Sequence, residues 1–329
     1  MKVLPKIYIT GGAGYVGSML SIYLAKKGYQ VTVLDLFIYE KNIFKNYKNI
    51  TTILGDIRDT KLLDETLPTH DIVIHLACIS NDPSFELNPQ LGKSINLLSF
   101  DPLVKLAKKN NVKKFIYASS SSVYGISDEK NVHEEIILKP LTDYSKFKAE
   151  CEQILLDYSS KEFCTTVIRP ATVCGYSVRQ RLDVVVNILT NLAYNKKEIT
   201  VFGGEQLRPN IHIDDMVKAY ELMIVTNKEL INNKIYNVGY DNYPVMKIAE
   251  KVKKLIGDDV KVNSVPTDDN RSYHISSQKI KDELGFAPEK NINDAILDLK
   301  KAFNAGLLPD SLKDKKYFNI ETMKNINLI

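Results

Sequence analysis

The sequence has little excess charge of either sign. Its 329 residues include 44 Lys and Arg against 40 Asp and Glu, which gives a formal net charge of +4. A nucleic-acid-binding domain usually carries a basic excess on one face. The sequence therefore predicts no nucleic-acid partner, and lysine-rich stretches such as residues 251–254 are interpreted as solvated helix faces.

Long apolar runs are also missing. No run approaches about 18 apolar residues, the length that a membrane-spanning helix needs. The chain starts with MKVLPKIYIT, an apolar run too short for a signal peptide. We therefore expect a cytoplasmic protein with no membrane partner.

Cysteine is scarce, and its spacing does not suggest metal ligands. Cys78, Cys151, Cys164 and Cys174 lie far apart, so we expect reduced structural thiols. His212 has no second ligand at a suitable spacing and is interpreted as structural. The sequence predicts no metal site.

No internal repeat or low-complexity linker divides the chain. The hydrophobic fraction of 44% and the charged fraction of 26% are typical of globular proteins and argue against disorder or a fibrous protein. Because the chain exceeds a common single-domain length, it predicts two domains or one large α/β unit with an appended lobe.

The first half alternates short β-branched runs with longer helical patterns, which is typical of parallel βαβ units. Residues 1–170 are therefore predicted to form a Rossmann-type α/β domain with a doubly wound parallel sheet. The predicted strands are residues 6–10, 30–35, 50–54, 72–76, 115–119 and 165–169. The predicted helices are residues 15–27, 61–66, 93–110 and 142–158.

The second half lacks this strict alternation. Residues 171–329 are predicted to form a smaller mixed α/β substrate-binding lobe, with segments near residues 211–240 crossing back to the sheet. The predicted helices are residues 182–193, 213–225, 245–256, 277–284 and 292–304. A strand is predicted near residues 199–202, followed by a turn at Gly203 and Gly204.

A glycine-rich loop, TGGAGYVG at residues 10–17, lies between the first predicted strand and helix. Gly11 and Gly14 allow a tight turn and a close approach of a pyrophosphate to the backbone. The helix that begins at Tyr15 and Val16 directs free N–H groups at the phosphates. This context favours a dinucleotide site over a purely structural glycine turn.

Asp35 ends the second predicted strand, 18 residues beyond Gly17. A carboxylate there accepts hydrogen bonds from the adenosine ribose hydroxyls and repels a 2′-phosphate. The sequence therefore predicts NAD as the cofactor.

Tyr144 and Lys148 are spaced i, i+4 in a predicted helix and share one face. A nearby ammonium and the nicotinamide ring favour the phenolate, which can then remove a hydroxyl proton. The pair is preceded by the serine run at residues 119–122, at the carboxyl end of a predicted strand, where parallel sheets bind ligands. One of these serines can hold the substrate oxygen.

Together these motifs resemble the extended short-chain dehydrogenase/reductases, specifically the NAD-dependent sugar-nucleotide epimerase/dehydratase family, over nearly the whole chain. In that family the catalytic Ser or Thr lies four residues before the Tyr of a Val-Tyr-Gly sequence. Counting back from Tyr124 gives Ser120, which completes a catalytic set with Tyr144 and Lys148. Asn96 matches a position that usually supports this site.

The resemblance extends to other cofactor contacts. Asp56 and Ile57 match the segment beside adenine, and Leu76 and Ala77 match the cofactor-lining end of the fourth strand. Pro170, after Arg169, resembles the strand end beside nicotinamide, and Tyr144 and Lys148 are themselves expected to contact the cofactor.

The serine run bears on the reaction. Family members that carry out 4,6-dehydration resemble Thr-Asp-Glu-Val-Tyr-Gly here, because an acid must protonate the departing C6 hydroxyl and a base must take the C5 proton. Ser121 and Ser122 replace that acidic pair, which disfavours dehydration, and decarboxylases of the family also tend to keep the glutamate.

Hydride transfer at a sugar hydroxyl, most simply at C4, remains. The resemblance favours an epimerase in bacterial surface-polysaccharide sugar synthesis by a narrow margin over a net NAD-dependent C4 dehydrogenase or reductase. A non-catalytic NAD-sensing protein usually loses the Tyr/Lys pair, which this chain retains.

The resemblance also implies a substrate site. Arg208 and Arg271 match arginines that grip the substrate diphosphate, for which planar guanidinium groups are suited. The further substrate-binding residues implied are Asn81, Ser121, Arg181 and Asn187. Nothing identifies the nucleobase, and a homodimer that pairs through residues 93–110 and 142–158 is expected by resemblance only.

Overall fold

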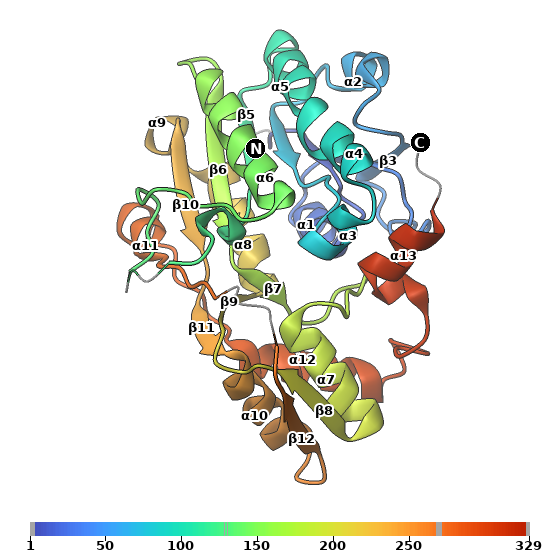
Figure 1. Cartoon of the computed structure of the whole chain (residues 1–329). Helices are drawn as coiled ribbons and strands as arrows, with labels where there is room; N and C mark the ends of the chain where they lie inside the picture. The colour runs from blue at the N-terminus through green and yellow to red at the C-terminus, as the bar shows by residue number, and fades with distance from the viewer. Residues whose placement is uncertain (1–3, 128, 130, 268–271, 327–329) are drawn as a thin grey trace.

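The computed structural model describes residues 4–127, 129, 131–267 and 272–326 (Figure 1). Its centre is a parallel seven-stranded sheet in the order β10-β6-β5-β4-β1-β2-β3. This architecture confirms the predicted Rossmann-type sheet. The strands are β1 (Ile7–Thr10), β2 (Val31–Asp35), β3 (Ile50–Leu54), β4 (Ile72–His75), β5 (Lys114–Ala118), β6 (Cys164–Pro170) and β10 (Lys234–Val238).

Both faces of this sheet are buried, because side chains alternate between two apolar clusters along each strand. Ile7 and Ile9 pack with α1 (Tyr15–Lys26) and α8 (Ile213–Val225) on one face. Tyr8 packs on the opposite face. The helices there are α2 (Thr60–Thr66), α5 (Phe100–Lys109) and α6 (Asp143–Asp157).

The sequence predicts one continuous helix at residues 93–110, and this prediction is wrong because the helix is interrupted. The chain instead forms α4 (Pro89–Lys93), a π-helical turn at Ser94–Leu98, and then α5. Asn96 in the π-helical turn accepts a hydrogen bond from the Ile79 backbone N–H (2.8 Å) and donates to the Ile79 carbonyl (2.9 Å). Such π turns often occur at functional sites, and this one ties the helix to the loop after β4.

The second lobe contains two small sheets, β11-β9-β7 and β12-β8. Sequence patterns missed β7, β9, β11 and β12 because these strands are short and polar, as in the sequence LRPNIH of β9. The strands are β7 (Thr172–Cys174), β8 (Glu198–Phe202), β9 (Leu207–His212), β11 (Asp241–Pro244) and β12 (Lys261–Val265).

Three helices pack around one apolar cluster of this lobe. The predicted helix at residues 182–193 begins and ends three residues later, as α7 (Val185–Lys196). The other two are α10 (Val245–Ile256) and α12 (Ile292–Asn304). The remaining short helices are α3 (Asp82–Glu86), α9 (Lys228–Ile231), α11 (Gln278–Leu284) and α13 (Asn319–Asn325).

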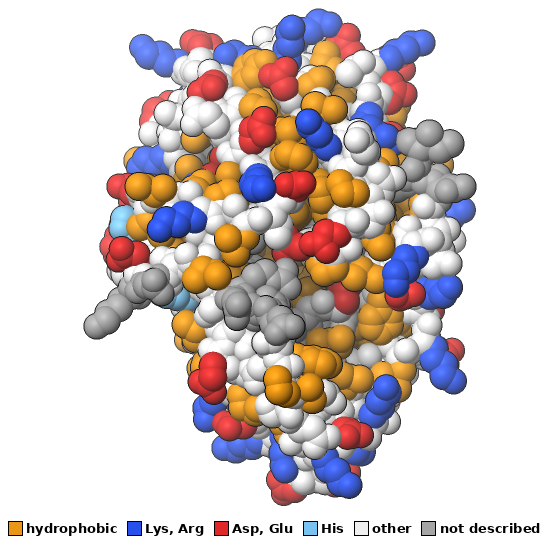
Figure 2. All heavy atoms as spheres, viewed as in Figure 1, with side chains coloured by type: hydrophobic (Ala, Val, Ile, Leu, Met, Phe, Trp, Pro, Cys, Tyr) orange, Lys and Arg blue, Asp and Glu red, His pale blue; other side chains and the backbone are white. Residues whose placement is uncertain are grey.

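The end of the chain returns to the first lobe, where α13 lies beside α3 (Figure 1). Figure 2 shows basic and acidic side chains interspersed on the visible face, in keeping with the small net charge. Within the described ranges, no helix has the length and apolar character to cross a bilayer.

Candidate active site

The glycine loop is packed so closely that no side chain fits at Gly11 or Gly17. Gly11 has φ +73°, and a Cβ there would lie 2.5 Å from the Ala77 backbone nitrogen. A Cβ on Gly17 would lie 2.2 Å from the Gly11 carbonyl oxygen. The loop is therefore a backbone cradle at the carboxyl ends of β1 and β4, and α1 begins directly after it.

Asp35 closes one side of this cradle. Its Oδ2 accepts a hydrogen bond from the Ala13 backbone N–H and its Oδ1 accepts one from Phe37, both over 2.9 Å. Burial raises the pKa of the Asp35 carboxyl, while these backbone donors and the charge of Arg179 act to lower it. The carboxylate is thus fixed at the end of β2, where the sequence predicts a ribose contact.

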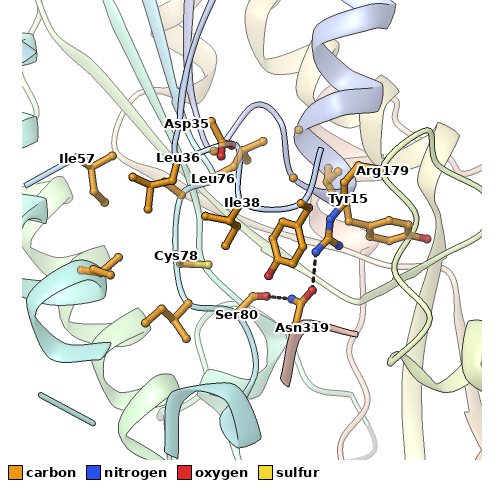
Figure 3. Close-up of a pocket in the computed structure, with 18 of the residues that line it drawn as sticks. Tyr15, Asp35, Leu36, Ile38, Ile57, Leu76, Cys78, Ser80, Arg179 and Asn319 are labelled. Carbon is orange, nitrogen blue, oxygen red and sulfur yellow. Dashed lines mark hydrogen bonds between the residues drawn. The ribbon is translucent and has the colours of Figure 1, made fainter. Parts of the chain in front are cut away.

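A cavity of about 230 Å³ opens in front of the cradle (Figure 3). Nine of the predicted cofactor-binding residues line it, whereas Tyr144, Lys148 and Pro170 do not. The glycine cradle, the buried carboxylate and the apolar walls fit a dinucleotide. The nine residues are Gly11, Gly14, Tyr15, Val16, Asp35, Asp56, Ile57, Leu76 and Ala77.

Asp56 is held by Arg58, whose Nη2 lies 2.7 Å from its Oδ2. Burial alone would raise the pKa of this carboxyl, but the hydrogen bonds from Arg58 lower it overall. Asp56 therefore lines the cavity as a carboxylate.

The predicted catalytic residues come from two neighbouring elements. Tyr144 and Lys148 lie on α6, whose N-terminus is capped by Thr142 with Ser145 in a capping box. The Lys148 Nζ donates to the Ala118 carbonyl at the end of β5 (2.7 Å) and lies 5.9 Å from the Tyr144 ring centroid. This contact fixes the lysine beside the tyrosine.

Ser120 follows β5 and caps the short 3₁₀ helix Ser121–Tyr124. Its Oγ accepts hydrogen bonds from the Ser122 backbone N–H (3.1 Å) and from the Ser122 hydroxyl (2.8 Å). Because the Ser120 oxygen is the acceptor in both bonds, its hydroxyl hydrogen can point toward Tyr144 or a substrate oxygen.

The pKa of the Tyr144 phenol lies well above its ordinary value. Burial is the main cause, and the neighbouring Cys78 and Asp82 add to it, while Arg181 and a hydrogen bond with Ser120 oppose it. Arg181 is therefore one of the groups that favour the Tyr144 phenolate.

A second cavity, of about 220 Å³, contains predicted substrate-binding residues. Asn81, Arg181 and Arg208 line it together with Ser122 and Asp82. Arg181 also lines the first cavity, so it stands in the wall between the two.

Two further predicted substrate-binding residues occupy different surroundings. Ser121 is buried and lines neither cavity, in contrast to Ser122. Asn187 is also buried and donates to the Tyr15 hydroxyl (3.0 Å) and the Arg181 carbonyl (2.8 Å), so it supports the loop that carries Arg181. Arg271 lies outside the described residues.

Sequence reasoning missed several residues that line the first cavity, among them Tyr39, Ser80, Arg179 and Asn319. Arg179 lies two positions before Arg181, which the family resemblance implies as a substrate-binding residue. No local signal marks Asn319, since it reaches the cavity from the end of the chain.

The structure brings Asp214 and Asp298 beside His212, with candidate ligand atoms within 4.8 Å of one another. The Lys290 ammonium already contacts both carboxylates, over 2.7 Å and 3.4 Å. These four side chains form an ion-pair cluster away from both cavities.

Comparison with known proteins agrees with this geometry. The model of the NAD dependent epimerase/dehydratase family matches residues 7–239. A dTDP-D-glucose 4,6-dehydratase from Dictyostelium discoideum is 34% identical over 76% of this chain, which spans 62% of that protein's length. A UDP-glucose 4-epimerase from Lactobacillus helveticus is 28% identical over 88% of this chain and 94% of its own length.

Among solved structures, a UDP-glucose 4-epimerase from Thermotoga maritima, determined with UDP-glucose, has a TM-score of 0.83. It is 26% identical and covers 92% of this chain and 99% of its own. The chain belongs to the NAD-dependent epimerase/dehydratase family, and its cofactor is NAD.

Proposed function

We propose that the protein is a sugar-nucleotide 4-epimerase. The observation that carries the proposal is the wall between the two cavities, where Arg181 faces both and where Thr142 and Ser145, on either side of Tyr144 in the sequence, line the second cavity. Tyr144 itself lines neither cavity, but through these neighbours a sugar in the second cavity would lie close to it, while its diphosphate would lie near Arg181 and Arg208. The relatives that act on UDP-glucose support a nucleotide-linked sugar as the substrate.

Each residue of the site has a separate role in the proposed reaction. The Ser120 hydroxyl binds the C4 oxygen, and the Tyr144 phenolate removes its proton and later returns it. Lys148, fixed by the Ala118 carbonyl, keeps positive charge beside the phenol. Bound NAD supplies the group that accepts hydrogen from C4 and gives it back. Arg181 and Arg208 bind the substrate diphosphate.

Epimerisation is favoured over 4,6-dehydration because the serine run offers no acid. Ser121 is buried, and the Ser122 hydroxyl donates to Ser120. Asp82 is an acidic residue of the second cavity, and its Oδ1 accepts a hydrogen bond from the Thr142 hydroxyl (2.5 Å). Asp82 begins α3 and contacts the N-cap of α6, so it does not occupy the sequence position of the missing acidic pair.

A net C4 dehydrogenase or reductase is the second candidate activity, because the same Ser, Tyr and Lys set serves both epimerisation and net oxidation or reduction. A 4,6-dehydratase is the third candidate activity, because dehydratases occur among the relatives. All three begin with oxidation at C4, so only the product distinguishes them.

The test is incubation of the full chain with UDP-, dTDP-, GDP- and CDP-hexoses, followed by NMR of the products and absorbance of NADH. We expect a C4-inverted sugar with no net NADH. Stoichiometric NADH with a keto-sugar would establish a dehydrogenase instead. A 6-deoxy-4-keto sugar would establish a dehydratase, and no conversion of any hexose would reject all three.

We also propose a homodimer that pairs through α5 and α6, as the family resemblance implies. Light scattering after size-exclusion chromatography tests it, since a mass of one chain, 37.3 kDa, would contradict pairing.

A further inference from the structure

Arg179 is a buried cation in the wall of the cofactor cavity. Its side chain is 4% exposed, and its Nη2 donates to the Asn319 Oδ1 over 2.7 Å. The guanidinium carbon lies 3.4 Å from the ring centroid of Tyr39, an arrangement that stabilises a cation on an aromatic face. The Arg179 Nε is buried and has no hydrogen-bond partner among the described residues.

The charge of Arg179 is not neutralised by a direct ion pair within the described part of the chain. Asp183 is engaged by the Arg181 guanidinium and the Asn319 backbone N–H, and Asp35 is engaged by backbone donors. Burial lowers the pKa of the Arg179 guanidinium to about 10, so it remains charged at neutral pH. A buried charge without a counterion is costly, so an anionic ligand in this cavity would stabilise the Arg179 guanidinium.

The same cavity receives the N-terminus of α1, a helix of 12 residues. Its N-cap, Gly14, has no side chain to accept from the free N–H groups, and its first turn contains no acidic residue. Helix N-termini attract anions, particularly phosphates. Arg179 and the α1 N-terminus, which begins at Tyr15 beside it, thus both direct positive charge into this cavity (Figure 3).

We propose that Arg179 binds the diphosphate of NAD and that Asn319, from the C-terminal helix α13, holds the guanidinium in the position to do so. The proposal depends on NAD as the cofactor and not on which reaction follows.

Asn319 is anchored well enough for this role. Besides accepting from Arg179, its Nδ2 donates to the Ser80 Oγ over 2.8 Å, and its backbone N–H donates to Asp183 over 2.7 Å. Figure 3 shows the resulting chain from Ser80 through Asn319 to Arg179. It connects the loop after β4 to the segment after β7, so α13 is part of the cofactor site.

The test measures binding of NAD, ADP, adenosine and UDP to the full chain freed of nucleotide, by isothermal titration calorimetry. Arg179→Met keeps apolar contact with Tyr39 but removes the charge. We expect its affinity for NAD and ADP to fall about ten- to hundredfold, as for loss of a charge-assisted hydrogen bond. Adenosine, which lacks phosphate, and UDP, which tests the substrate's diphosphate, should bind within about twofold of wild type.

Asn319→Ala leaves the arginine but removes its anchor, so NAD and ADP affinity should fall less, by about three- to tenfold. Lys324→Gln is the control on the same helix, because Lys324 is half-exposed and pairs only with Glu321 among the described residues. It should bind all four ligands like wild type.

Unchanged NAD and ADP binding by Arg179→Met would overturn the proposal. An equal loss for adenosine would also overturn it, and selective loss of UDP would assign Arg179 to the substrate instead. Thermal melts without ligand separate these results from misfolding, because removing an unpaired buried charge should not lower the melting temperature. If Arg179→Met fails to fold, Asn319→Ala replaces it as the test. A fall in ADP affinity relative to adenosine affinity would support the proposal, and an unchanged ratio would overturn it.

Discussion

The Glu152 carboxylate and the Arg169 guanidinium form an ion pair inside the protein, with Arg169 Nη2 2.6 Å from Glu152 Oε2 and the side chains only 3% and 4% exposed. Glu152 lies one turn beyond Lys148 on α6 and also accepts a hydrogen bond from the Ser119 hydroxyl, next to Ser120. The pair therefore joins the ends of β5 and β6 to the helix that carries Tyr144, the proposed catalytic base.

Glu152→Ala should destabilise the fold strongly, because it leaves the buried Arg169 without a counterion. Loss of one partner of a buried pair typically lowers the free energy of unfolding by about 3–5 kcal/mol. Urea unfolding followed by circular dichroism measures it. The double variant Glu152→Met with Arg169→Met should lose much less, and a loss below about 1 kcal/mol in the single variant would contradict the assigned role.

Tyr144→Phe should remove turnover while leaving NAD bound. The substitution deletes only the hydroxyl, and loss of a positioned acid–base group typically lowers kcat by about 10²–10⁴. Steady-state kinetics and NAD titration measure the two effects separately. Tyr158→Phe, at the C-terminal end of the same helix, is the control, because its hydroxyl bonds only to Asp101 among the described residues. Comparable activity in both variants would reject Tyr144 as the base.

Gly11→Ala should lose both NAD binding and stability, since the new Cβ would meet the Ala77 backbone at 2.5 Å. Gly285→Ala is a matched control: its φ of +70° resembles the +73° of Gly11, but nothing lies within 4 Å of its Cβ position. The control measures backbone strain alone, about 1–2 kcal/mol. We expect about 2–5 kcal/mol for Gly11→Ala, where overpacking adds to strain. Equal losses in chemical unfolding would show that the close contact is unimportant.

The parts of the site that could be predicted from sequence are those that local geometry determines. The glycine cradle and Asp35 are formed by one βαβ unit, and Tyr144 and Lys148 share a helix face by their spacing alone. These signals identified the sheet and nine of the residues that line the first cavity.

Contacts between distant segments could not be predicted in this way. Arg179 meets Asn319 across 140 positions of the chain, and neither residue lies in a periodic pattern. The π-helical turn at Ser94–Leu98 was missed because it depends on the bonds between Asn96 and the distant loop at Ile79. Likewise, β9 is a strand because β7 and β11 pair with it, not because its polar sequence favours one.

The ion-pair cluster of His212, Asp214, Lys290 and Asp298, which lines neither cavity, predicts a specific acid sensitivity. The pKa of Asp298 is lowered from 3.8 by its interaction with His212 and by the charge of Lys290, although burial opposes the shift. Because the folded pKa lies below the unfolded one, this carboxylate stabilises the fold fully above about pH 3.8, and the contribution disappears as the pH falls through the folded pKa. Asp298→Asn should therefore be less stable than wild type at pH 6, and the difference in the free energy of unfolding should shrink as the pH falls below about 4.

Urea unfolding between pH 3 and pH 6 measures this difference. Asp258→Asn, at an exposed position, is the control and should match wild type throughout. A difference that stays constant down to pH 3 would mean that Asp298 contributes by packing rather than by charge.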